Sequence, residues 1–93
     1  MHFMRMVRTN TSEIYGIVDD AGDIAGRIDL HYSADGRVNG LVTVSTEMSK
    51  DEELAICEKI DDEIVNDKDL EDDDFSITFV QARSMNIYGN TGA

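Results

Sequence analysis

The pattern of hydrophobic and polar positions predicts three strands in the first half of the chain. Residues 13–18 are rich in β-branched and aromatic side chains, which is typical of a strand. In residues 24–32 hydrophobic and polar side chains alternate with period two, as in a strand with one buried face and one solvated face. Residues 38–46 carry valines at alternate positions and predict a third strand. Short connections between these segments indicate an antiparallel β-meander.

Aspartate and glycine mark the two turns of the meander. Asp19–Asp23 has the composition of a tight turn, and Asp35-Gly36 is a strong hairpin signal. Asn39-Gly40 competes as the second turn, but a turn at Asp35-Gly36 joins strands of similar length. Gly40 is then expected at a bulge or at a close approach of the backbone.

After residue 48 the hydrophobic spacing changes to that of a helix. Ser49 followed by Glu52 matches a capping box, and Asn66 suits the residue just past a helix C-terminus. We therefore predict one amphipathic helix over Asp51–Val65. Its predicted buried stripe is Leu54, Cys57, Ile60 and Ile64, flanked by Ala55, Ile56 and Val65.

A fourth strand is predicted where Phe75, Ile77 and Phe79 alternate with polar residues. It should be parallel to any odd-numbered strand of the meander beside it, because the helix and the return strand reverse the chain twice. The predicted fold class is α+β: an antiparallel β-meander of three strands, then one amphipathic helix and a fourth strand, with the helix packed on one face of the sheet.

The predicted domain organisation has three parts. Residues 1–12 form an N-terminal segment, as an extra strand or an arm; residues 13–83 form a single α+β domain; residues 84–93 form a flexible C-terminal tail. Both sides of the first strand of the meander are hydrophobic, and one helix cannot cover both faces of a sheet. Either the Phe3–Val7 segment or another subunit should cover the second face, so a homodimer is one expectation.

The composition of the 93-residue chain, 41% hydrophobic and 30% charged, is that of a globular domain. No hydrophobic run approaches the ~20 residues needed to cross a bilayer, and the N-terminus lacks a signal-peptide pattern. Cys57 is the only cysteine, which excludes an internal disulfide and a cysteine-built zinc site. We expect a cytoplasmic protein that does not contact membranes.

Nearly all of the net charge of −12 comes from one segment, because residues 47–74 contain fourteen acidic residues and three lysines. A surface of one sign can steer a basic partner, whereas solubility or adaptation to high salt would explain the acidity without any partner. Direct nucleic-acid binding is unfavourable because phosphates would be repelled. The predicted partner-binding residues are Glu58, Asp62, Glu63, Asp67, Asp69, Glu71, Asp72, Asp73 and Asp74.

Candidate catalytic and metal-binding patterns fail on spacing. An EF-hand that begins at Asp67 would need glycine at Asp72 and glutamate at Thr78. Successive residues on one face of the strand through Asp29 and His31 lie about 6.6 Å apart, too far for a hydrogen-bonded triad with Ser33. We interpret the row Arg27, Asp29, His31 and Ser33 as a solvated face with an ion pair, and predict no catalytic residues, metal site or cofactor.

Two helix residues carry predictions of their own. Cys57 should be a small buried hydrophobic side chain whose thiol pKa is raised by the acids around it, and therefore unreactive. Asp61 falls toward the buried side of the helix, where an unpaired carboxylate is costly. We expect it to pair with Arg27 or Arg83, or to lie at the edge of an interface.

The function predicted from these patterns is a non-enzymatic interaction module, an adaptor or inhibitor. Its acidic helix and the loop at 67–74 would dock onto a basic protein surface, such as that of a nucleic-acid-binding protein. The alternative is a small homo-oligomeric structural protein whose acidity reflects solubility or high-salt adaptation. An enzyme is not expected, because the sequence has no nucleophile–base pair, phosphate loop or metal cluster.

We expect added salt to raise the melting temperature of this chain. Acidic residues near the helix C-terminus oppose the helix dipole by about 0.3–1 kcal/mol each, and salt screens this repulsion as well as that between neighbouring carboxylates. Thermal unfolding followed by circular dichroism at low and high sodium chloride measures the effect. A melting temperature that does not change with salt would contradict a strained acidic segment.

Overall fold

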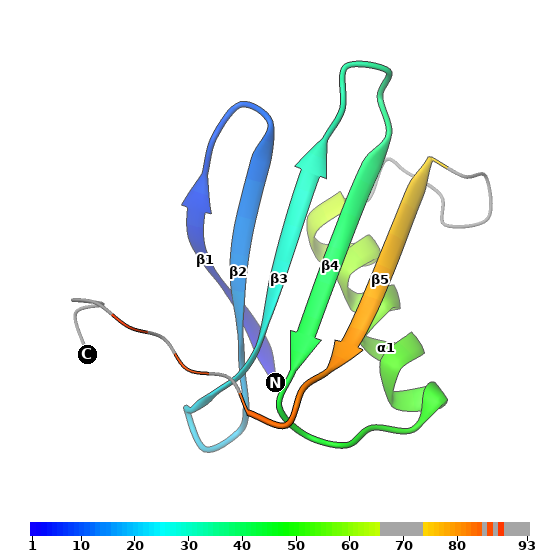
Figure 1. Cartoon of the computed structure of the whole chain (residues 1–93). Helices are drawn as coiled ribbons and strands as arrows, with labels where there is room; N and C mark the ends of the chain where they lie inside the picture. The colour runs from blue at the N-terminus through cyan, green and yellow to red at the C-terminus, as the bar shows by residue number, and fades with distance from the viewer. Residues whose placement is uncertain (66–73, 85, 87, 89–93) are drawn as a thin grey trace.

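The computed structural model describes residues 1–65, 74–84, 86 and 88, which form a five-stranded sheet and one helical segment (Figure 1). The predicted α+β class is confirmed. The elements in chain order are β1 (His2–Arg8), β2 (Ser12–Val18), β3 (Ile24–Tyr32), β4 (Val38–Val44), α1 (Lys50–Ile60), the π-helical turn η1 (Asp61–Val65) and β5 (Phe75–Gln81).

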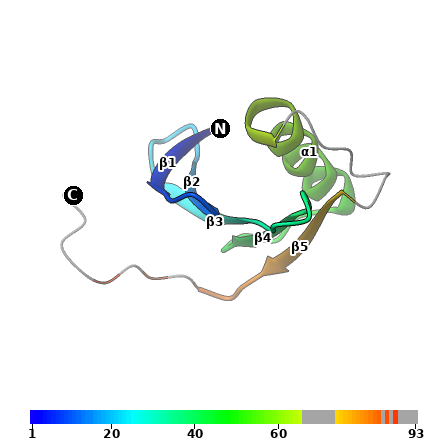
Figure 2. The same cartoon turned by 90° about the horizontal axis from the view of Figure 1, so that it is seen from above.

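The strands lie in the order β1-β2-β3-β4-β5, and each neighbouring pair is antiparallel except β4 and β5. The parallel pairing of β5 with β4, the third strand of the predicted meander, is as predicted. The sheet is strongly curled, and α1 lies on its concave side over β4 and β5 (Figure 2). Placement of the helix on one face of the sheet is therefore also confirmed.

The sheet has five strands where four were counted in the predicted domain, because the N-terminal segment forms the extra strand given above as the alternative to an arm. His2–Arg8 is an edge strand paired with β2. The register shifts between Arg5 and Val7, so a bulge at Met6 breaks the alternation that would have identified β1 from the sequence. This segment extends the sheet at its edge and does not cover the second face, so the alternative in which it covers that face is wrong. On β1, Met4 and Val7 remain 44% and 45% exposed.

The turns follow the predicted chemistry. Gly36 has a φ of 85°, a left-handed conformation that glycine adopts without strain, which confirms the turn at Asp35-Gly36. The pairing of β3 with β4 is continuous, so Gly40 forms no bulge. It is instead a close approach: a Cβ atom at this position would lie 3.2 Å from Leu30 Cδ2 and 3.4 Å from Ile77 Cγ1.

The helix begins with the predicted capping box. The Ser49 hydroxyl accepts from the backbone N–H of Glu52, and the Glu52 carboxylate accepts from the backbone N–H of Ser49. Lys50–Val65 is helical throughout, close to the predicted range, but its last five residues form the π-helical turn η1 rather than a regular α-helix. The predicted Asn66 lies outside the described residues.

The π-helical turn corrects the predicted buried stripe. Ile56, Ile60 and Val65 are buried, whereas Leu54 is 58% exposed and Cys57 and Ile64 are half-buried. In a regular α-helix Val65 would point about 140° away from Ile60, since each residue turns the chain by about 100°. The wider π-helical turn brings these two residues, five apart in sequence, onto the same face.

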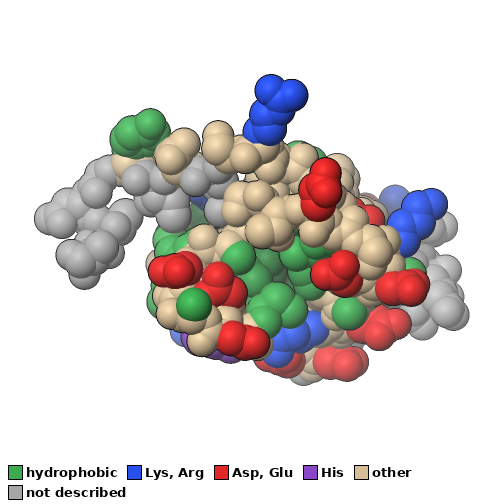
Figure 3. Space-filling model, turned by 90° about the horizontal axis from the view of Figure 1, so that it is seen from below, with side chains coloured by type: hydrophobic (Ala, Val, Ile, Leu, Met, Phe, Trp, Pro, Cys, Tyr) green, Lys and Arg blue, Asp and Glu red, His purple; other side chains and the backbone are tan. Residues whose placement is uncertain are grey.

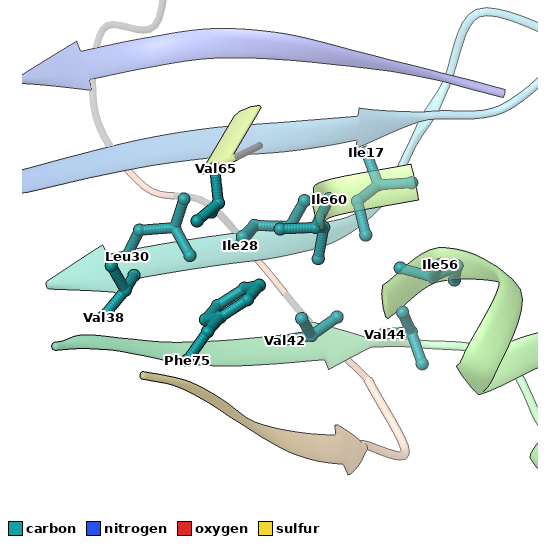
Figure 4. Packing of buried hydrophobic residues seen from close by; sticks show 10 residues of the cluster. All are labelled: Ile17, Ile28, Leu30, Val38, Val42, Val44, Ile56, Ile60, Val65 and Phe75. Atoms are coloured by element: carbon teal, nitrogen blue, oxygen red, sulfur yellow. The ribbon is translucent and has the colours of Figure 1, made fainter. Parts of the chain in front are cut away.

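The hydrophobic core lies between α1 with η1 and the concave face of the sheet. Side chains from β3 and β4 point toward those of the helix, and Phe75 of β5 lies between them (Figure 4). The buried cluster consists of Ile17, Ile28, Leu30, Val38, Val42, Val44, Ile56, Ile60, Val65 and Phe75.

The predicted partner of Asp61 is wrong. Arg27 pairs with Asp29, and Arg83 forms no ion pair with Asp61. Oδ1 of Asp61 is buried and has no hydrogen-bond partner among the described residues. A buried acceptor left in this state costs about 1–3 kcal/mol, so Asp61 destabilises the fold as described.

Within the residues that the structure describes, no helix has the length and hydrophobicity needed to span a lipid bilayer.

Replacing Asp61 with leucine should therefore leave the fold intact and raise its free energy of unfolding by about 1 kcal/mol. The substitution removes an unpartnered carboxylate and a negative charge near the helix C-terminus. Urea denaturation of the wild type and Asp61→Leu measures the difference, with Asp62→Leu, at an exposed neighbour, as the control. A loss of stability in Asp61→Leu would show that the carboxylate is paired.

Candidate partner-binding surface

The structure describes four of the nine predicted partner-binding residues. Glu58 is exposed on α1, and Asp62 and Glu63 are exposed on η1. Asp74 is exposed immediately before β5. Asp67, Asp69, Glu71, Asp72 and Asp73 lie outside the described residues. Within the described residues, the acidic surface is therefore that of the helix and its flanks.

Little of this acidity is neutralised within the described part of the chain. Glu63 forms an ion pair with Lys59, whose ammonium also lies 5.0 Å from the centre of the Phe3 ring. The other ion pairs involve Asp20, Asp29 and Asp35, which all belong to the sheet and its turns. Glu58 and Asp62 have no basic partner among the described residues, so their charges face solvent.

The start of the helix is fixed to the end of β5 by Gln81. Its side-chain amide accepts from the backbone N–H of Met48 at 3.1 Å and donates to the Met48 carbonyl at 2.9 Å. The same amide nitrogen lies 3.1 Å from the carboxylate of Glu53. Gln81 thus holds the β4–α1 connection and the first turn of α1 against the sheet.

A largely hydrophobic groove of about 230 Å³ lies between α1 and β5. Leu54, Cys57 and Phe79 form its walls, and Lys50 and Glu53 lie at one end. The predicted buried stripe thus splits in two, because Leu54 and Cys57 face this groove while the core uses other residues.

The single thiol lies in this groove. Burial, and next the negative charge of Glu53, raise the pKa of Cys57 above its ordinary value. The direction agrees with the prediction from the sequence, although burial rather than charge is the main cause. The thiol is half-buried and predominantly protonated at neutral pH, which makes it a slow nucleophile.

A second hollow, of about 220 Å³, opens at the end of the molecule where β2 meets β3. Hydrophobic side chains form its floor, and carboxylates surround it (Figure 3). Asp19 and Asp20 come from the β2–β3 turn, and Thr46 and Met48 come from the connection to α1. We refer to this feature as the acidic hollow. It brings turn carboxylates to the same end as the acidic first turn of α1 (Figure 1).

The carboxylates of the β2–β3 turn are partly engaged within the chain. Asp19 Oδ1 accepts from the backbone N–H groups of Ala21 and Asp23, which stabilises the turn. The N-terminal ammonium of Met1 lies 2.6 Å from Asp20 Oδ1. The acidic hollow is therefore less negative than its residue types imply, and the helix carries the larger unpaired charge.

The row of polar residues on β3 forms an ion pair, as predicted. The guanidinium of Arg27 donates to both carboxylate oxygens of Asp29, at distances between 2.8 and 3.2 Å. The hydrogen bonds that Arg27 donates to Asp29 raise the pKa of Arg27. His31 is exposed and makes no hydrogen bond to Asp29 or Ser33, so the described geometry supports no triad.

A polar cluster at Glu13 was not identified from the sequence. The hydroxyls of Tyr15 and Tyr32 both donate to the Glu13 carboxylate, the latter at 2.8 Å, and Arg8 lies nearby along the same opening. Burial works against the charged form, but the two hydrogen bonds and the arginines outweigh it and lower the pKa of Glu13. Burial and the hydrogen bond to Glu13 raise the pKa of Tyr15 to about 12. Arg8 and Tyr32 come from the strands on either side of the one that carries Glu13 and Tyr15, so no local sequence pattern marks the whole cluster.

No group of three His, Cys, Asp or Glu side chains converges as metal ligands would, within the residues that the structure describes. The acidic segment at 67–74, whose spacing does not match an EF-hand, lies outside them except for Asp74.

Glu13→Gln should lower the free energy of unfolding by about 1 kcal/mol at pH 7, since hydrogen bonds to a charged carboxylate are stronger than those to an amide. The lowered pKa of Glu13 adds stability above its unfolded-state value of 4.5, and this stability is lost as pH falls through the folded-state pKa. The difference between the wild type and Glu13→Gln should therefore shrink in acid. Denaturant unfolding at several pH values measures it, and a gap independent of pH would contradict the interpretation.

Comparisons with protein-family models, with curated proteins and with solved structures find no match to this chain.

Proposed function

We propose that this chain is a non-enzymatic acidic interaction module, an adaptor or inhibitor that docks onto a basic protein surface through its helix. A nucleic-acid-binding protein is one such partner, because the carboxylates would occupy the positions that phosphates otherwise take. The segment at 67–74 is the second part of this proposed surface on sequence grounds.

The observation that carries this proposal is the unpaired acidity of the helix. Asp51, Glu52, Glu58 and Asp62 are exposed and have no lysine or arginine partner among the described residues. Acids in the first turn favour the helix dipole, whereas Asp62 opposes it. Fold stability therefore does not explain the charges at the C-terminal end of the helix, while a basic partner would.

A second candidate function is self-association as a small structural protein. The sheet face opposite α1 has no cover among the described residues, and Met4, Met6 and Val7 are each more than 40% exposed at its β1 edge. A hydrophobic surface of this kind favours contact with another subunit. Sedimentation velocity over a range of protein concentrations distinguishes the two candidates, because only self-association gives a concentration-dependent mass in the absence of a partner.

Reversing two helix charges, Glu58→Lys with Asp62→Lys, should weaken binding of a lysine-rich peptide about tenfold at low salt. The wild-type affinity should itself fall steeply between about 50 and 200 mM salt. Isothermal titration calorimetry measures both effects, and circular dichroism confirms the fold.

The matched control is the double substitution Asp23→Lys with Asp35→Lys, which changes the net charge equally but lies in the turns of the sheet. It should weaken binding only about twofold. Equal losses in the two variants would mean that net charge alone drives association, without a defined helix surface.

A further inference from the structure

The two edge strands of the sheet, β1 and β5, differ in whether they carry features that prevent pairing with another strand. β1 carries a bulge at Met6 and two arginines, Arg5 and Arg8. Bulges and edge charges are features with which proteins prevent unwanted strand pairing. β5, at the other edge, pairs with β4 without any irregularity, and its sequence FSITFVQ contains neither a charged residue nor proline. Within the described residues, β5 therefore presents a flat strand edge without these features.

The backbone groups that β5 directs outward can be identified from its hydrogen bonds. The carbonyl of Asp74 accepts from the backbone N–H of Val38, and the N–H of Ala82 donates to the carbonyl of Val44. Since the register has no shift, the backbone N–H and C=O groups of the even-numbered residues between these ends point toward β4. The N–H and C=O groups of the odd-numbered residues, including Ile77 and Phe79, consequently point toward the open edge.

The groove between α1 and β5 runs beside this edge. Phe79 contributes its backbone to the edge and its side chain to the groove, opposite Leu54 and Cys57. Leu54 is 58% exposed, a high value for a leucine in a core-packed helix. A strand added to β5 would place alternate side chains toward this groove, which would bury Leu54 and the edge of Phe79.

The charge around the edge decides which occupant fits. Glu58 lies four residues after Leu54, and therefore on the same side of α1, and Asp62 follows in η1. A second copy of this chain at the same edge would bring its own acidic helix close to these residues, and like charges would repel. An extended segment would complement them if the face turned to the groove carried hydrophobic residues at its central positions and lysine or arginine at its outer positions, since only every second side chain lies on that face.

We propose that the β5 edge and the α1–β5 groove together bind an extended basic segment of a partner protein as a sixth strand. Its backbone pairs with Ile77 and Phe79, and its central hydrophobic side chains enter the groove. The basic side chains at the ends of the same face lie beside the acidic helix. This inference rests on the proposed function, because it specifies how the basic partner is bound.

Two synthetic peptides of roughly nine residues test the proposal. In both, every second residue is threonine, and the other positions, which share one face, carry lysine at the two ends. The residues between these lysines are valine in the lysine–valine peptide and serine in the lysine–serine peptide. Both carry the same charge, but only the first can fill the groove. Amide hydrogen exchange by NMR should slow about tenfold at Ile77 and Phe79 on saturation with the lysine–valine peptide. Thr78, whose N–H faces β4, should change little. Alkylation of Cys57 should slow in parallel.

Leu54→Ser should weaken binding of the lysine–valine peptide about fivefold, because a hydrophobic contact in the groove is lost. The matched control is Leu41→Ser, an exposed leucine of β4 on the opposite sheet face, which should bind as the wild type does. Circular dichroism establishes that both variants fold.

The outcomes separate this inference from the proposed function. Equal binding of both peptides at low salt, with no slowing at Ile77 and Phe79, overturns strand addition and leaves the acidic module standing. Binding of neither peptide overturns both. Slow, concentration-dependent exchange at these amides without peptide would show that the edge pairs with a second copy, which also overturns the proposal.

Discussion

The contact between the helix and the concave face of the sheet is the interaction on which the other features depend. Ile56, Ile60 and Val65 pack against strands β3 and β4, with Phe75 completing the contact. Burying side chains of this size contributes about 1.5–3 kcal/mol each, a large share of the stability of a small domain. This packing fixes the rotation of the helix, and the rotation determines which side chains face solvent, the groove or the core.

The meander and the helix could be predicted because their signals are local. Alternation through β3, the Asp35-Gly36 turn and the Ser49–Glu52 capping box each act within a few residues, and each is found as predicted. The sequence left β1 open as an extra strand or an arm, because its bulge at Met6 interrupts the alternation that marks a strand. The π-helical turn was missed because its widening is favoured by burial of Val65 in the tertiary structure, which no helical wheel contains.

The candidate surface was predictable only in part for a similar reason. The excess of acidic residues is a property of composition and can be counted along the chain. The α1–β5 groove requires Leu54 to be excluded from the core and Phe79 to lie opposite it, which depends on the rotation of the helix. The Glu13 cluster joins hydroxyls from β2 and β3, and the acidic hollow joins a turn to a distant connection. Contacts of this kind depend on how the strands are aligned in the sheet, and the spacing of residues along the sequence does not reveal them.

The hydrogen bonds of the Gln81 side chain hold the end of β5 and the beginning of α1 together. One side chain satisfies both backbone groups of Met48 and also reaches Glu53. Since Met48 also lines the acidic hollow, a displacement of the last residue of β5 would alter the shape of a cavity on another part of the surface. A ligand bound at either of two places joined in this way would change the affinity of the other place for its own ligand.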